Sequence, residues 1–334
     1  MRVVVVGAGI AGISVARALV ARGCRPTVVA PDHGFTPSGA GIVSEQFADP
    51  LLAARARRSA EVLRRSVTAH ACPMAQIALS GRSAGSLGGI EGSRPGLPAA
   101  LRRDLAPDFL GRIARAVWSP RTFWVAPREV LRAFARGSRI VRARVRAVRE
   151  GLVETDRGAI PADAVVVANG VWARRLLPDL RFELRRAQTA RARGAISAMF
   201  HVLDTGLYAR PDGRFLLAGD GDARWSAGPG PRASAVTRGF LVETAGALRR
   251  TLRACGPPRP GRAGLVAMTA DRRPIVGRRG GVWVACAFGG DGLALAPAFG
   301  EEVAGEILGI SARATSLQPR VDLQRVQAAT DGLR

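Results

Sequence analysis

The sequence predicts an α/β protein built from a discontinuous parallel-sheet domain and an inserted, mainly antiparallel sheet. Three short apolar runs at residues 3–6, 164–168 and 282–285 carry no polar face. This is typical of parallel strands that are covered on both sides. A glycine-rich turn and a segment with helical periodicity follow the first run, while short alternating segments lie between the second and third runs. This change of pattern indicates a second domain inserted into the first.

The composition is that of a globular chain of one or two domains. The 334 residues are 47% apolar and 23% charged, and the 50 basic residues exceed the 26 acidic ones by 24. All 50 basic residues are arginines, spread along the chain rather than gathered with aromatic residues. A nucleic-acid-binding surface concentrates its basic residues, so the sequence predicts no nucleic-acid partner.

The residues that are absent exclude several chemistries. Without lysine there is no Schiff-base enzyme and no P-loop nucleotide site. The three histidines have no zinc-ligand spacing, so no metal site is expected. Four separated cysteines without a CxxC pair favour reduced thiols and a cytoplasmic protein. Residues 3–20 are apolar enough to resemble a signal peptide, but glycines interrupt them, so we interpret them as part of the fold. No membrane partner is expected.

The first 32 residues have the pattern of a βαβ unit that binds a dinucleotide. Residues 3–6 form the first strand, residues 11–22 the helix and residues 27–30 the second strand. Gly7 permits the turn, while Gly9 lets a pyrophosphate approach the backbone. Gly12 allows close helix packing, and Asp32 can accept hydrogen bonds from a ribose diol. The predicted turn contacts are Gly7, Ala8, Gly9, Ile10, Ala11 and Gly12.

FAD and NAD both contain an ADP moiety, so other segments must distinguish them. Ser38-Gly39-Ala40-Gly41-Ile42, the strand around Val145, and residues 164–172, 269–277 and 288–293 resemble motifs of one family. That family comprises the FAD-dependent D-amino acid oxidases, glycine oxidases and sarcosine oxidases (the DAO family). The resemblance implies a Rossmann-type FAD-binding domain. The implied cofactor contacts are Ser38, Ala40, Gly41, Ile42, Val145, Asn169, Gly170, Trp172, Gly289, Gly290, Asp291, Gly292 and Leu293.

The resemblance and the strand pattern together suggest domain boundaries. Residues 1–80, 136–180 and 260–315 would form the FAD-binding domain. Residues 81–135 and 181–259 would form the substrate domain, leaving 316–334 as a C-terminal tail.

The expected substrate site departs from the family pattern. Val266 stands where amino acid oxidases of this group carry a carboxylate-binding arginine, and Ala294 stands at the lysine position of the sarcosine branch. Either another arginine, such as Arg210 or Arg214, has taken over, or the substrate has no free carboxylate. Gly264 stands near the cysteine that binds flavin covalently in the sarcosine branch, so non-covalent FAD is expected.

Tyr208, the only tyrosine, lies in a segment resembling one that points a tyrosine at the substrate in glycine oxidases. We therefore expect Tyr208 to be catalytic, and Tyr208 and Val266 to contact the substrate. The predicted reaction removes a hydride from the amine-bearing carbon of a small-molecule amine or amino-acid derivative, free or carrier-bound. The alternatives are a flavin-dependent dehydrogenase or monooxygenase of a natural-product pathway, and a non-catalytic FAD-binding subunit.

Overall fold

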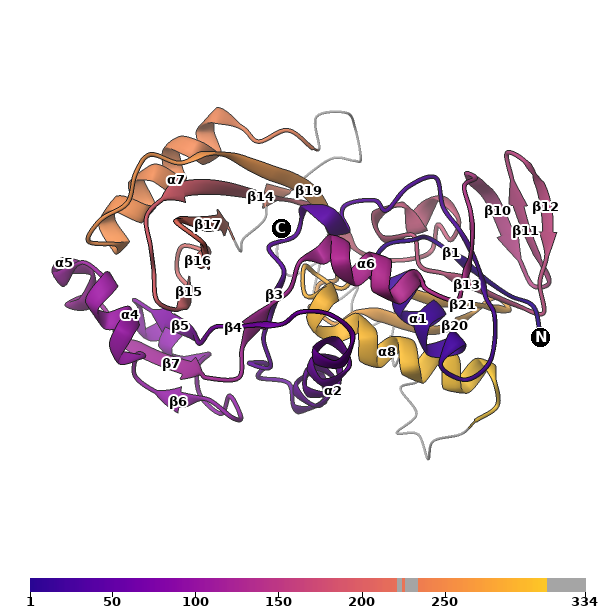
Figure 1. The fold of residues 1–334 in the computed structure, drawn as a ribbon, viewed down its shortest axis with the longest axis horizontal. Helices are drawn as coiled ribbons and strands as arrows, with labels where there is room; N and C mark the ends of the chain where they lie inside the picture. Colours follow the sequence, from indigo (N-terminus) through magenta and orange to yellow (C-terminus); the bar gives the residue numbers. More distant parts are fainter. Residues whose placement is uncertain (221–223, 226–233, 311–334) are drawn as a thin grey trace.

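A six-stranded sheet forms the centre of one part of the molecule, which lies on the right in Figure 1. The computed structural model describes residues 1–220, 224–225 and 234–310. All neighbouring strands of this sheet run parallel except the β20–β21 pair. The predicted buried runs are confirmed as β1, β13 and β21. In spatial order the strands are β20 (Ile275–Arg279), β21 (Val282–Cys286), β13 (Ala164–Val167), β1 (Val3–Val6), β2 (Thr27–Val29) and β9 (Arg139–Val141).

Helices cover one face of this sheet and a small sheet lies toward the other. One core cluster joins alternate residues of β1 to α1 (Ile10–Val20), α2 (Pro50–Ser66), α6 (Pro127–Ala135) and α8 (Gly292–Ile307). A second cluster joins Val4 and Val6 to the three-stranded sheet and to the 3₁₀ helix η2 (Gly170–Arg175). That sheet comprises β10 (Val145–Arg149), β11 (Leu152–Thr155) and β12 (Gly158–Pro161). The wholly apolar sequence of β1 therefore reflects burial on both sides.

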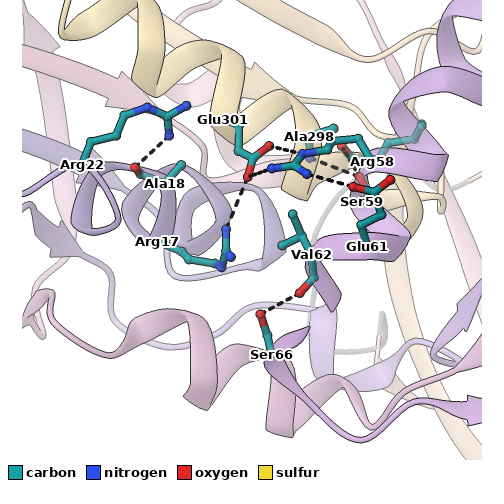
Figure 2. A network of polar contacts seen from close by, with 11 residues as sticks. Arg17, Ala18, Arg22, Arg58, Ser59, Glu61, Val62, Ser66, Ala298 and Glu301 are labelled. Atoms are coloured by element: carbon teal, nitrogen blue, oxygen red, sulfur yellow. Dashed lines mark hydrogen bonds and ion pairs between the residues drawn. The ribbon is translucent and has the colours of Figure 1, made fainter. Parts of the chain in front are cut away.

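Helix α8 begins earlier than the sequence pattern predicts. We expected a helix at residues 297–308, but α8 starts at Gly292 and contains Pro297. A proline inside a helix removes one hydrogen bond and disturbs its neighbours. Ser59 repairs this region, because its hydroxyl donates to the Leu295 carbonyl at 3.2 Å and accepts from the Ala298 amide at 3.1 Å. Figure 2 shows Ser59 beside Ala298.

Charged side chains join helices α1, α2 and α8, which pack together on one face of the six-stranded sheet. Glu301 on α8 lies 2.7 Å from Arg58 Nε on α2 and 3.7 Å from Arg17 Nη1 on α1 (Figure 2). Backbone contact is also close, since a Cβ on Gly300 would lie 2.6 Å from the Ser14 carbonyl carbon. The middle of α8 is thus fixed relative to α1.

A nine-stranded, mainly antiparallel sheet forms the second part of the molecule (Figure 1). Its core lies under α4 (Ala99–Asp104), α5 (Pro107–Leu110) and α7 (Arg238–Thr251). The path of the sheet is β18 (Arg224–Trp225), β14 (Glu183–Arg193), β17 (Phe215–Asp220), β16 (Leu207–Asp212), β15 (Met199–Val202), β5 (Met74–Ala78), β7 (Arg115–Ser119) and β6 (Arg94–Pro95), with β19 (Arg259–Met268) beside β14.

Two segments differ from their predicted local structure. Residues 256–264 were expected to be a proline-rich connection, but most of them belong to β19, which pairs with β14. Pro260 is accommodated next to a register shift, where β19 pairs with no further described strand on its other side. The predicted loop at 81–98 contains α3 (Gly81–Gly85) and the short β6.

The domain boundaries remain a prediction. Both β5 and β19, which lie near the proposed boundaries at residues 80 and 260, belong to the nine-stranded sheet. A second three-stranded sheet contains the remaining strands of the described residues, β3 (Ile42–Val43), β8 (Phe123–Trp124) and β4 (His70–Ala71). No helix in the described part of the chain has both the length and the apolar character needed to cross a membrane.

Candidate flavin and substrate site

A cavity of about 410 Å³ lies where the parallel strands end, the usual ligand position in a sheet of this type. It extends from the turn after β1 to the start of α8 and the wall formed by β19. Most of the predicted site residues line it. They are Gly7, Ala8, Gly9, Ile10, Ala11, Asp32, Val145, Asn169, Gly170, Trp172, Val266, Gly289, Gly290, Gly292 and Leu293.

The glycine turn has the geometry expected of a dinucleotide cradle. Gly7 has φ +111°, and a Cβ there would lie 2.5 Å from the Ala168 carbonyl oxygen. A Cβ on Gly12 would lie 1.9 Å from the Gly7 carbonyl oxygen, so Gly12 permits packing and does not itself line the cavity. Around Gly9, a Cβ would come within 3.4 Å of only one atom, the Thr36 hydroxyl oxygen. The Gly9 edge of the turn therefore opens toward the cavity.

The loop after β2 supports this turn through three further residues, His33, Phe35 and Thr36. Thr36 accepts a hydrogen bond from the Ile10 amide at 3.1 Å, and His33 Nδ1 lies 3.2 Å from the Ala8 carbonyl oxygen. Both residues line the cavity, as does Phe35, whose ring stacks on Trp172 with centroids 5.3 Å apart. Their position directly after Asp32 was the only sequence signal for them.

Asp32 and Asn169 present oxygen atoms at the cavity. Asp32 is exposed, and its Oδ1 accepts a hydrogen bond from the Gly34 amide at 2.6 Å. Asn169 precedes η2, and its buried Oδ1 has no hydrogen-bond partner among the described residues. Because buried polar atoms are normally paired, Asn169 Oδ1 is suited to a donor from a bound ligand.

The start of α8 forms the opposite end of the cavity. Gly289 and Gly290 have φ values of +61° and +98°, which a turn of this shape requires. Asp291 precedes the helix and does not line the cavity. The residue as a whole is exposed, yet the protein around its carboxyl group desolvates that group and raises its pKa to about 6, with Arg272 opposing the shift.

The loop at 38–42 approaches the site through Gly39. Gly39 lines the cavity, whereas Ser38, Ala40, Gly41 and Ile42 do not. Gly41 has φ +79°, and a Cβ there would lie 2.1 Å from the Val125 carbonyl oxygen. The contacts of these four residues with the cofactor therefore remain a prediction, while the geometry gives Gly41 a role in seating the loop.

Tyr208 lies on β16, outside the cavity lining. Its ring packs over Gly219 of β17, where a Cβ would lie 2.4 Å from the phenol oxygen. Burial raises the Tyr208 pKa, Asp220 adds to the rise, and Arg210 opposes it. The phenol is thus protonated at neutral pH, and its catalytic role remains a prediction.

Neither arginine proposed from the sequence offers a free guanidinium to the cavity. Arg210 is buried, stacks 4.3 Å from the Trp124 ring centroid and donates to the carbonyl oxygens of Ala40 and Pro211. It also lies 3.4 Å from Asp212. Arg214 is exposed next to the β16–β17 turn and stacks on Phe215.

The fold and the site together define a dinucleotide-binding protein with a second, mainly antiparallel sheet. The chain belongs to the FAD-dependent oxidoreductase (DAO) family, whose family model matches residues 2–306. The cofactor is therefore FAD, and the open edge at Gly9 and the unpaired Asn169 oxygen fit such a ligand.

Two curated relatives match most of this chain. Each is named a tRNA 5-methylaminomethyl-2-thiouridine biosynthesis bifunctional protein, MnmC. The protein from Caulobacter sp. (strain K31) is 28% identical over 334 residues, covering 92% of this chain and 55% of the relative. The protein from Caulobacter vibrioides is 29% identical, with 92% and 54% covered. The chain thus spans about half the length of these relatives.

Solved structures share the fold over nearly the whole chain. L-proline dehydrogenase from P. horikoshii is 21% identical with a TM-score of 0.80, covering 94% of this chain and 95% of that one. Glycine oxidase from Geobacillus kaustophilus is 20% identical with a TM-score of 0.76, covering 92% and 95%. Iminodiacetate oxidase from Chelativorans sp. BNC1 is 23% identical with a TM-score of 0.71, again covering 92% and 95%.

Proposed function

We propose that this enzyme oxidises a C–N bond of an amine or amino-acid-derived small molecule. The observation that carries the proposal is one continuous cavity that extends from the Gly9 turn to Val266 on β19. When bound, FAD supplies the acceptor for the hydride that leaves the amine-bearing carbon. The nitrogen lone pair then forms the C=N bond, and water hydrolyses the imine to a carbonyl compound and an amine.

The protein holds and orients the reactants in this proposal. The turn at Gly7–Gly9 and the N-terminus of α1 would bind the pyrophosphate, and Asp32 the ribose hydroxyls. The amides at the start of α8 would lie at the pyrimidine edge of the flavin and stabilise negative charge there. Val266 would exclude water from the substrate side. Correct placement of the C–H bond then provides much of the rate enhancement, without a strong side-chain base.

Non-covalent attachment of FAD is part of the proposal. Gly264 has no side chain with which to bond the flavin. Cys286 lines the cavity, but burial raises the pKa of its thiol to about 12. Since the thiolate is the reactive form, Cys286 is poorly suited to forming a flavin bond at neutral pH. Release of intact FAD on denaturation would support this part of the proposal.

Purification followed by a substrate screen tests the function. The folded protein should be yellow, and at least one amine should reduce its bound FAD under anaerobic conditions. Denaturation of the protein should release FAD into the supernatant. Peroxide production in air would identify an oxidase, whereas turnover only with an added acceptor would identify a dehydrogenase. A colourless protein that binds NAD, or a flavin that no amine reduces, would contradict the proposal.

A second candidate substrate is an aminomethyl group carried on tRNA. The names of the curated relatives favour it. Adding purified bacterial tRNA distinguishes the two. If the substrate is tRNA-borne, undermodified tRNA should bleach the flavin and small amines should not. Saturation by a small amine, unaffected by excess tRNA, would exclude this candidate.

A further inference from the structure

We infer that Arg185 binds a carboxylate of the substrate, beside Val266. This inference rests on the proposed function, because it assigns the substrate class of the same cavity. The sequence left two possibilities open, a carboxylate bound by a relocated arginine or a substrate without a free carboxylate. The inference favours the first possibility. It assigns the role to Arg185, in place of Arg210 or Arg214.

Strand pairing places Arg185 next to Val266. In the antiparallel pair of β14 and β19, Arg185 lies directly opposite Val266. Directly opposite residues point to the same face of a sheet, with Cβ atoms about 4.5–5.5 Å apart. A long arginine side chain at this position can therefore reach past the valine on the same side of the sheet.

That side of β19 faces the cavity. Gly264 and Met268, two residues before and after Val266, share its face. A Cβ on Gly264 would lie 3.1 Å from the ring of Phe35, and Met268 lies 3.9 Å from the position of a Cβ on Gly289. Phe35 and Gly289 both line the cavity, as does Val266 itself.

Arg185 has an unused donor that is already removed from solvent. Its Nη2 donates to Glu183 at 3.3 Å, and the Glu183 side chain is 59% exposed. Its Nε is buried and has no hydrogen-bond partner in the ranges that the structure describes. A buried donor without a partner is costly, and a carboxylate oxygen would pair with it through a strong, charge-assisted bond.

Other arginines near the cavity are less suited to this role. Arg186, the next residue on β14, is opposite Leu265 and points to the other face of the sheet. Arg210 is engaged by Ala40, Pro211 and Asp212. Arg144 lines the cavity, but it also lines a second cleft together with Pro31, the residue before Asp32. This places Arg144 near the predicted ribose contact. Unlike these three arginines, Arg185 lies directly opposite Val266 and on the same face of the sheet.

A binding measurement on the FAD-loaded enzyme tests the inference without turnover. Acetate and benzoate serve as unreactive carboxylates, with acetamide and benzamide as neutral matches, and the flavin absorbance change reports binding. R185Q should raise the carboxylate Kd at least tenfold while leaving the amide response unchanged. R193Q, an exposed arginine at the far end of β14, should bind carboxylates as the unmodified enzyme does.

A second variant covers the case in which R185Q does not fold. Glu183 is exposed, and E183Q would release Arg185 from its ion pair, so carboxylates should bind several-fold more tightly. Equal carboxylate affinity in folded R185Q, or weaker affinity in E183Q, would overturn the inference. Flavin content and melting temperature identify variants that fail to fold.

The failures of the two proposals are distinguishable. If carboxylates bind through Arg185 but no amine reduces the flavin, the proposed function fails and the carboxylate site stands. If amines reduce the flavin and R185Q leaves carboxylate affinity unchanged, the function stands and this assignment of Arg185 is wrong.

Discussion

Arg210 Nε lies 2.7 Å from the carbonyl oxygen of Ala40, joining β16 of the nine-stranded sheet to the loop at 38–42. The guanidinium is buried between Trp124 and strand β16, where Asp212 and the Pro211 carbonyl occupy its Nη1. The bond crosses from one part of the molecule to the other. Arg210 therefore positions the loop whose Gly39 lines the cavity.

Replacing Arg210 with methionine should destabilise the protein and weaken flavin retention. The variant leaves the Ala40 carbonyl without its donor and removes one of the two partners of Asp212, whose other partner is Arg191. We expect a loss of about 2–3 kcal/mol in the free energy of unfolding, measured by urea denaturation. Arg214→Met, at an exposed site, should change it by no more than about 0.5 kcal/mol. Equal effects of the two changes would contradict the positioning role.

Replacing Gly9 with valine should abolish flavin binding while leaving the fold intact. The branched side chain would occupy the opening through which a pyrophosphate approaches the turn. FAD content per folded protein, from absorbance after gel filtration, is the measurement. Gly239→Val is a matched control, because a Cβ at Gly239 meets nothing within 4 Å. Full flavin occupancy in Gly9→Val would mean that this turn does not hold the cofactor.

The first βαβ unit was predictable because its signals are local. Burial of β1, the turn at Gly7 and the close approach of Gly12 all follow from residues adjacent in sequence. Arg185 could not be found in this way, because its relation to Val266 depends on the register of two strands about 80 residues apart. Likewise, Pro297 suggested the start of a helix, and only the distant Ser59 explains why α8 continues through it.

Replacing Ser59 with alanine should destabilise the protein by about 1–3 kcal/mol in the free energy of unfolding. The change leaves the Ala298 amide and the Leu295 carbonyl without their partner in a buried position next to Pro297. Ser66→Ala is a useful control on the same helix, since Ser66 donates only to the Val62 carbonyl one turn earlier (Figure 2). Denaturant unfolding of the two variants should separate them. A Ser66→Ala effect as large as that of Ser59→Ala would contradict the repair of α8 by Ser59.

Asp291 should make the folded protein less stable as the pH rises from about 4 to 6. Desolvation raises its folded-state pKa to about 6 from an ordinary value of 3.8, so the folded state holds the proton more tightly than the unfolded state. The stabilisation is complete below the unfolded pKa and is lost as pH rises through the folded one. Asp291→Asn should remove this component, which unfolding curves at pH 4.5 and 7 would measure. An unchanged difference between the two pH values would show that Asp291 does not titrate in this way.

Anaerobic stopped-flow reduction of the bound flavin is the most direct test of C–N oxidation. The enzyme is mixed with a panel of amines and amino acids, and the yellow absorbance is followed while the product is analysed for a carbonyl compound. C–N oxidation predicts rapid bleaching with at least one member of the panel, together with formation of the matching carbonyl product. A flavin that dithionite bleaches but that stays oxidised with every amine and amino acid would contradict it.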